Sequence, residues 1–206
     1  MSEIATLHMP AISDHQLVQI VDSALLDATR KSGTWLACKP GCNQCCIGAF
    51  AINQLDAARL RDGLQLLTLR DPERAFKLQQ RVAASLARLS PEFPGDVRSG
   101  LLSEEPQAQE RFEIFANDET CPVLDPATGT CDLYEFRPMT CRVFGPPVRS
   151  EEGLGVCELC FHGATPEEIA ACEMVPDPDD LEAALVKQLE QTTGASGTTI
   201  VAFALA

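Results

Sequence analysis

Four of the ten cysteines in this 206-residue chain lie within nine residues, in the segment CKPGCNQCC that spans positions 38–46. They are Cys38, Cys42, Cys45 and Cys46. Thiols this close are hard to explain as core residues, and the adjacent Cys45 and Cys46 could form only a strained disulfide. Pro40 and Gly41 indicate a loop, which can aim several side chains at one point. The segment is therefore typical of a site for a soft metal ion or an iron–sulfur cluster.

The other six cysteines form a second block, a close pair and a single residue. They are Cys121, Cys131, Cys141, Cys157, Cys160 and Cys172. Cys172 lies in a helical pattern, so we interpret it as a buried spare thiol rather than a ligand. Ten cysteines in 206 residues is below the roughly 8–10% typical of disulfide scaffolds. Many cysteines in a reducing compartment indicate metal or redox work instead.

The second block carries a longer motif. It opens with CPVL at Cys121 and continues as GTCDLYEFRPMTCR over positions 129–142. Together with the first block, it closely resembles the YkgJ-type cysteine-cluster family, also described as the zinc- or iron-chelating CxxCxxCC domain. The resemblance covers about residues 38–160. The chain departs from the family pattern in a wide insertion between the two blocks, which carries a helix predicted over 71–90.

The resemblance implies a metal site of up to eight cysteines, but it implies no particular reaction. The predicted ligands are Cys38, Cys42, Cys45, Cys46, Cys121, Cys131 and Cys141, with one or both of Cys157 and Cys160. Neighbouring Cys45 and Cys46 are expected to point apart and so to be able to serve different metals. His162 is a less favoured nitrogen ligand, because sulfur is already ample.

Ligation by cysteine alone fits both zinc and iron–sulfur chemistry. We favour an iron–sulfur cluster, of the 4Fe–4S type, with a redox-linked role. Two alternatives stay open: a structural zinc module that binds another protein, and a cluster-dependent modifying enzyme. A similar domain occurs within the longer chains of flagellin lysine N-methylases, which makes a protein lysine N-methylase one such enzyme. No catalytic residue can be named, so whether the protein is an enzyme is left open.

Three residues near Cys141 are expected to support the cofactor from outside its ligand set. The guanidinium groups of Arg137 and Arg142 could donate hydrogen bonds to sulfur or offset the negative charge of a cluster. Tyr134 is the only tyrosine, and we expect it to pack against the site. Trp35 is interpreted as an apolar shield over the first block.

The charge of the chain limits its partners. The net charge is −14 and the isoelectric point is about 4.5. Such a chain binds nucleic acid and anionic membrane surfaces poorly, because both need clustered Lys and Arg. The expected partner is a protein or a small molecule. Residues 1–10 lack the pattern of a signal peptide, and no apolar run approaches the ~20 residues of a membrane helix, so we expect a cytoplasmic protein.

Capping residues and apolar periodicity predict a mostly α-helical protein with irregular cysteine-rich loops and room for a minor β element. Helices are expected over 14–30, 53–66, 71–89 and 103–115, and from 165 and 179 onward. The apolar tail 198–206 is expected either to add a strand or to dock on the core. We expect a single domain over 1–206, with a cysteine-cluster core at 34–162. The helix at 13–32 and the helical segment 165–206 are expected to pack on this core.

Overall fold

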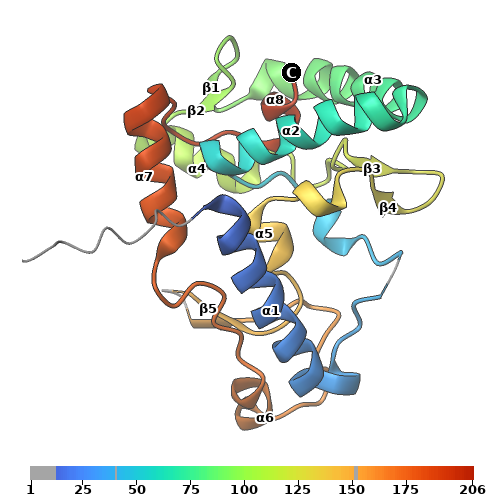
Figure 1. Cartoon of the computed structure of the whole chain (residues 1–206), viewed down its shortest axis with the longest axis vertical. Helices are drawn as coiled ribbons and strands as arrows, with labels where there is room; N and C mark the ends of the chain where they lie inside the picture. Colours follow the sequence, from blue (N-terminus) through green and yellow to red (C-terminus); the bar gives the residue numbers. More distant parts are fainter. Residues whose placement is uncertain (1–12, 40, 151–152) are drawn as a thin grey trace, which may run out of the picture.

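The computed structural model describes residues 13–39, 41–150 and 153–206, and the chain in these ranges is mostly α-helical, as predicted (Figure 1). The α-helices are α1 (Asp14–Ser32), α2 (Gln54–Arg70), α3 (Pro72–Leu89), α4 (Pro106–Ile114), α5 (Met139–Arg142), α6 (Pro166–Ala171), α7 (Leu181–Thr193) and α8 (Val201–Ala204). The predictions for residues 1–10 and for Pro40 lie outside the described ranges. In the described part of the chain, no helix combines the length and the apolar character needed to cross a membrane.

The strands are short and form three antiparallel pairs. They are β1 (Gly95–Asp96) with β2 (Leu101–Leu102), β3 (Leu124–Asp125) with β4 (Thr130–Cys131), and β5 (Val148–Ser150) with β6 (Gly153–Gly155). The minor β element that the sequence allowed is thus present as hairpins within the loops.

The helices begin where the capping residues predicted them. The side chain of Ser13 caps α1 in a capping box with Gln16, and the Asn53 side chain accepts the N–H of Asp56 at the start of α2. Thr165 forms the same kind of box for α6. The expected start near Ser103 was wrong, because α4 begins at Pro106 and has no side-chain cap.

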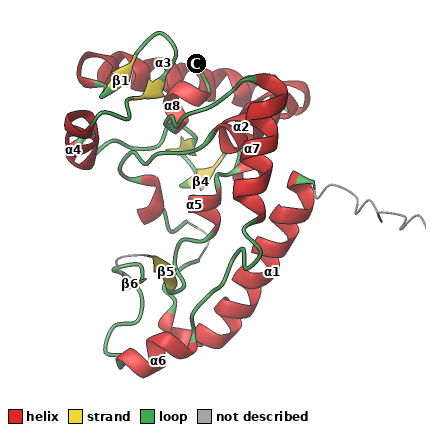
Figure 2. Ribbon diagram, turned by 90° about the vertical axis from the view of Figure 1, so that its left-hand side faces the viewer, coloured by secondary structure: helices red, strands yellow, loops and turns green. Residues whose placement is uncertain are grey.

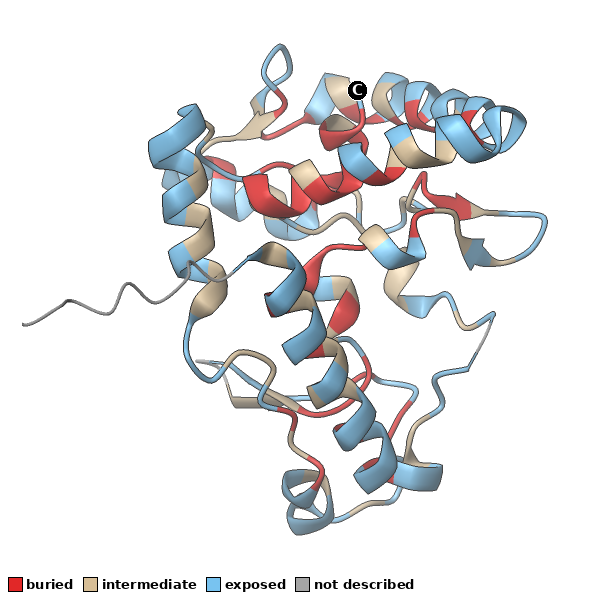
Figure 3. Ribbon diagram, in the orientation of Figure 1, coloured by how far each residue is buried: buried red, intermediate tan, exposed pale blue. Residues whose placement is uncertain are grey.

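The upper part of the molecule in Figure 1 is a helical layer made by α2, α3 and α8. Leu60 of α2, Leu78 of α3 and Val201 of α8 contribute to one buried core (Figure 3). Of the two alternatives for the C-terminal tail, docking is observed: α8 is buried against α2 and α3. The strand that the sequence allowed for this tail is limited to an isolated β-bridge between Thr199 and Ile52.

The lower part is organised by α1, which packs against α5 and α7 (Figure 2). Leu17 and Val21 of α1 bury their side chains together with Met139 and Met174 in a second core. The lower end of α1 lies close to α6 in both views. The cysteine-rich loops connect this part to the upper helical layer.

Candidate metal centre

A cavity of about 610 Å³ brings together eight of the ten cysteines. Those that line it are Cys38, Cys42, Cys45, Cys46, Cys121, Cys131, Cys141 and Cys157. Much of the remaining wall is apolar, with Leu60 of α2 and Val123 among its residues. Segments more than a hundred residues apart in the sequence therefore present thiols to one space, as expected for a metal centre.

Tight turns place the first cysteine block along the cavity wall. The N–H of Cys42 donates to the carbonyl of Lys39 at 2.9 Å, and the N–H of Cys46 donates to that of Asn43 at 2.9 Å. Gly41 has a φ of 89°, which favours glycine at this position. The first cysteine block is therefore built from two consecutive turns. A regular helix could not direct four thiols toward one point.

Backbone pairing joins the second block to the first. The N–H of Cys121 donates to the carbonyl of Cys46 at 2.8 Å, and Cys131 pairs with Leu124 in the β3–β4 hairpin. Cys141 lies on α5. The buried carboxylate of Asp56 on α2 accepts the N–H of Met139 at 2.9 Å, and so holds the first turn of α5.

The third cysteine segment lies at the lower end of the molecule. The N–H of Phe161 donates to the Trp35 carbonyl at 2.9 Å, and the N–H of Ala37 donates to Cys160 Sγ at 3.4 Å. The rings of Trp35 and Phe161 stack at 6.4 Å, and both pack in a cluster that includes Cys157 and Cys160. Trp35 thus covers the pair at 157–160 rather than only the first block.

The predicted ligand Cys160 does not line the cavity, and neither do Cys172 and His162, the two other residues that we considered as ligands. Cys172 is 5% exposed and packs beside Cys157 and Cys160 in the same apolar cluster. It is buried, as predicted. His162 is exposed at the surface.

Burial and crowding raise the pKa of most of these thiols. Burial is the main cause for Cys38 and Cys121, and each pKa rises to about 12. The backbone amide two residues after a cysteine opposes this rise in pKa. The N–H of Val123 favours the thiolate of Cys121, and the N–H of Leu159 favours the thiolate of Cys157. Leu133 does the same for Cys131. Such amides stabilise thiolates that bind metals.

Cys45 and Cys46 influence each other's protonation. The side chain of Cys46 is the main cause that lowers the pKa of Cys45 to about 6, and the side chain of Cys45 is the main cause that raises the pKa of Cys46. The positive charge of Arg137 lowers the pKa of Cys45 further. Both thiols belong to the 3₁₀ turn Gln44–Cys46. That they point apart and serve different metals stays a prediction.

Arg142 lines the cavity, but its hydrogen bonds go to oxygen. Its side chain is 1% exposed, and Nη1 donates to both carboxylate oxygens of Asp22 on α1, at 2.9 and 3.0 Å. Nε donates to the carbonyl of Arg137 at 3.2 Å, and Nη2 donates to that of Glu135. Arg142 therefore fastens the loop before Cys141 to α1. Donation to sulfur, which we predicted, is not among these bonds.

Arg137 and Tyr134 stack at the edge of the same cavity. Cζ of Arg137 lies 3.9 Å from the centre of the Tyr134 ring, and Nη1 donates to the Tyr134 carbonyl at 2.8 Å. The tyrosine is 56% exposed, so it packs against the site from the solvent side. Arg137 is placed to offset negative charge near Cys45.

Sequence reasoning missed the ion pairs that support the segments of Cys121 and Cys131. Asp132, whose side chain is 1% exposed, pairs with Arg74 and Arg81 of α3. Nε of Arg81 also donates to the carbonyl of Pro122 at 2.9 Å. The helix carried by the insertion therefore supports both cysteine segments. An aspartate directly after a predicted ligand was the available signal, but its partners could not be read from the sequence.

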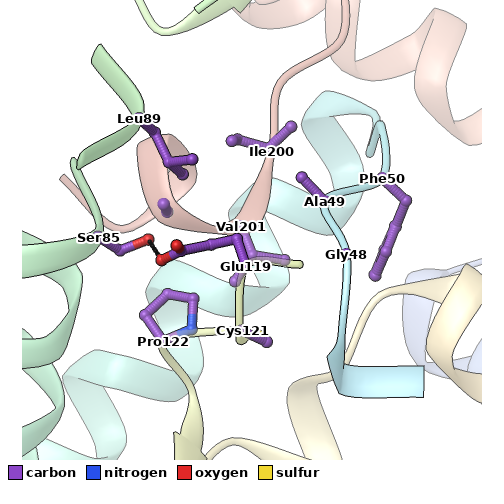
Figure 4. Close-up of a pocket in the computed structure, with 11 residues that line it drawn as sticks. Gly48, Ala49, Phe50, Ser85, Leu89, Glu119, Cys121, Pro122, Ile200 and Val201 are labelled. Carbon is purple, nitrogen blue, oxygen red and sulfur yellow. Dashed lines mark hydrogen bonds between the residues drawn. The ribbon is translucent and has the colours of Figure 1, made fainter. Parts of the chain in front are cut away.

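A second, much smaller cavity of about 20 Å³ lies behind Cys121 (Figure 4). Glu119 lies on its wall, where its carboxylate accepts a hydrogen bond from Ser85 of α3 at 2.8 Å. The cavity is large enough for about one water molecule and too small for a substrate. The chemistry of the site therefore belongs to the larger cavity.

Within the described residues, no three or more His, Cys, Asp or Glu side chains are gathered closely enough to hold one metal ion. The donor set itself, cysteine thiols with amide donors in a largely apolar cavity, fits a thiophilic metal. Comparisons with curated proteins and with solved structures each gave no match. The family model for CxxCxxCC, described as "Putative zinc- or iron-chelating domain", matches residues 37–161. The chain therefore belongs to the CxxCxxCC family and is a metal-binding protein.

Proposed function

We propose that this protein carries a cysteine-ligated iron–sulfur cluster and uses it in a redox-linked role. The observation that carries the proposal is the convergence of eight cysteines, from three separate segments, on one cavity. A bound cluster would supply one-electron transfer. The residues that would hold it come from the cysteines on the cavity wall and from Cys160, which shares a tight turn with Cys157.

The surroundings of the thiols support this use. Backbone amides favour the thiolates of Cys121, Cys131 and Cys157, and hydrogen bonds to sulfur are one means by which proteins tune cluster potentials. Apolar side chains make up much of the cavity wall. Arg137 supplies a positive charge near Cys45, which offsets the charge that thiolates bring.

Iron is favoured over a purely structural zinc ion by the amount of apolar core that the fold has without any metal. The core of Leu17, Val21 and Met139 contains no cysteine among its described members, and that of Leu60 and Leu78 has cysteines only at its edge. Helices that pack in this way have little need for a metal staple with so many thiols. A redox-active metal centre explains the large number of cysteines better than a structural zinc ion does.

The acidic surface and the cavity favour a protein or small-molecule partner over nucleic acid or a membrane. A net charge of −14 opposes approach to phosphate groups. A reducing compartment such as the cytoplasm would keep the ten cysteines available for metal.

Anaerobic purification tests the proposal. The protein is expected to be brown, to contain iron and acid-labile sulfide, and to absorb broadly near ~400 nm in a band that dithionite bleaches. Cys141→Ser should lower the iron content, whereas Cys172→Ser, at a cysteine outside the cavity wall, should leave it unchanged. A colourless protein with stoichiometric zinc would refute the redox role and support the structural zinc alternative.

A further inference from the structure

We infer that the cysteines form two separate metal centres, a lower one at Cys38, Cys42, Cys157 and Cys160 and an upper one at Cys46, Cys121, Cys131 and Cys141. The inference rests on the proposed function, because it divides the ligands of the proposed iron–sulfur site. It goes further in naming which thiols act together and in placing the boundary within the first cysteine block.

The lower group is held by contacts between the segment that follows α1 and the turn at 157–161. The N–H of Ala37, next to Cys38, donates to Cys160 Sγ at 3.4 Å. The N–H of Cys160 donates to the carbonyl of Cys157 at 2.8 Å, so these two cysteines share one tight turn. Cys42 is placed by the turn that its own N–H closes with Lys39.

Gly145 shows how closely Cys38 is packed in this group. A Cβ atom at Gly145 would lie 2.8 Å from Cys38 Sγ, too close for any real side chain, and the φ of 117° also favours glycine. The backbone therefore leaves a space that the Cys38 thiol fills. Leu36, which packs in the cluster of Trp35 and Phe161, lies 3.9 Å from the same Cβ position.

The upper group is held by different contacts. The Cys121 N–H donates to the Cys46 carbonyl, and an isolated bridge joins Ile47 to Thr120. Cys121 and Cys131 both pack against the core of α2, α3 and α8, and no cysteine of the lower group is among the described members of that core. Cys141 joins this group from α5, whose first turn is held to α2 by the hydrogen bond from the Met139 N–H to Asp56.

A side-chain hydrogen bond also joins the first cysteine block to the 157–161 turn. Nε2 of Gln44 donates to Oε1 of Glu158 at 2.7 Å.

The first cysteine block is therefore shared, and the boundary falls between Cys42 and Cys45. The lower group has four thiols, the number that one iron–sulfur cluster or one zinc ion needs. Among the described residues no three such side chains already lie close enough to hold a metal, so each group must close around its metal during loading. The upper centre has five thiols if Cys45 is counted, one more than such a set needs. Cys45, next to Cys46 in the chain, is the thiol outside this set of four.

Single substitutions in each group test the division. Cys42→Ser and Cys160→Ser belong to the lower group, and Cys121→Ser and Cys131→Ser belong to the upper one. Each protein is purified anaerobically, reconstituted with Fe²⁺ and sulfide, and analysed for iron, sulfide and the electron paramagnetic resonance of the dithionite-reduced state. Each variant is expected to lose about half of the iron. The two lower variants should retain one spectrum, and the two upper variants should retain the other.

Combining Cys42→Ser with Cys121→Ser is expected to remove nearly all of the metal, whereas Cys42→Ser with Cys160→Ser should still leave half. The division into two centres is overturned if all four single variants lose the same spectrum. It is also overturned if any single variant loses all of its metal while its circular dichroism stays that of the wild type.

Wild-type protein gives a second measurement that does not depend on the folding of any variant. Native mass spectrometry during stepwise loading should show chains with one centre and chains with two. A fully loaded chain with a single cluster would overturn the two centres but keep the proposed function. Two zinc ions per chain without iron would overturn the proposed function but keep the two centres.

Discussion

Arg81 of α3 offers the sharpest test of how the fold supports the metal centre, because one side chain holds two cysteine segments. Its Nη2 pairs with Asp132, next to Cys131, and its Nε donates to the carbonyl of Pro122, next to Cys121. Replacement by methionine keeps most of the apolar stem and removes only these polar contacts. The variant therefore measures the contribution of the Arg81 guanidinium group alone.

The cost follows from the burial of Asp132, whose side chain is only 1% exposed. Loss of one partner of a buried ion pair costs about 3–5 kcal/mol, because a charge is left uncompensated. Arg74 still pairs with Asp132, but it is 44% exposed and compensates only in part. The lost bond to Pro122 adds about 1 kcal/mol. We expect Arg81→Met to lower the free energy of unfolding by roughly 3 kcal/mol in total.

Urea unfolding of the metal-free protein measures this loss, and competition with a chelator measures metal affinity. Both should decrease in Arg81→Met, since misplaced thiols bind metal less well. Arg81→Lys should recover part of the stability, because its single ammonium can pair with Asp132 but cannot also reproduce the fork geometry toward Pro122. Lys77→Met on the same helix is the matched control, because Lys77 pairs with Glu73 at the exposed surface.

The reasoning is refuted if Arg81→Met unfolds and binds metal as the wild type does. If the variant loses stability but keeps its full metal affinity, Arg81 supports α3 alone and does not position the cysteines. Equal effects of Arg81→Met and Lys77→Met would mean that burial of Asp132 has no energetic consequence.

Three further changes probe the packing and the protonation of the site. Gly63→Ala on α2 should destabilise the protein by about 1–3 kcal/mol in urea unfolding, despite a better helix propensity, because its Cβ would lie 2.6 Å from Cγ of Phe136; a more stable variant would contradict this. Gly145→Ala should displace the Cys38 thiol and lower the metal-to-protein ratio, so a full ratio would show that Cys38 is not confined there. The pKa of Cys121 is raised from 9.0 to about 12, so the metal-free unfolded chain releases this proton first. The stability of the metal-free protein should therefore fall as the pH rises from about 9 towards 12, in urea titrations at pH 8 and 10, whereas metal-loaded protein, which has no proton there to lose, should not share this fall.

Local signals were enough to predict most of the helices. Ser13, Asn53, Asp71 and Thr165 each accept a hydrogen bond from the first turn of the helix that they were expected to cap. The tail 198–206 was ambiguous, because a short apolar segment has the same composition in a strand and in a buried helix. Its contact with α2 and α3 decided the outcome, and that contact is not a local property.

The cysteine spacing predicted a metal site but not how the site is supported. Asp132 lies directly after Cys131, yet its partner Arg81 is 51 residues away, on a helix that interrupts the family pattern. Asp56 likewise serves α5 from a distance of 83 residues, through the N–H of Met139. Pairings of this kind depend on how the helices pack, and one sequence does not contain that information.

The distribution of apolar contacts indicates which part of the fold depends on metal. The cluster around Phe161 is built largely from cysteines, since Cys157, Cys160 and Cys172 make up the rest of its buried members. The core of α2, α3 and α8, by contrast, is made mainly of aliphatic side chains. Because metal binding is also folding free energy where ligands form the core, metal removal should loosen residues 157–172 first.

Hydrogen exchange of metal-loaded and chelator-treated protein measures this difference. Amides of residues 157–172 should exchange much faster without metal, whereas those of α2 and α3 should keep most of their protection. Cys172→Ser in the metal-loaded protein separates packing from ligation, since this thiol lies in the cluster but outside the cavity wall. A uniform loss of protection over the described helices would show instead that the metal holds the whole fold, and the helical layer would then not be an independent scaffold for the site.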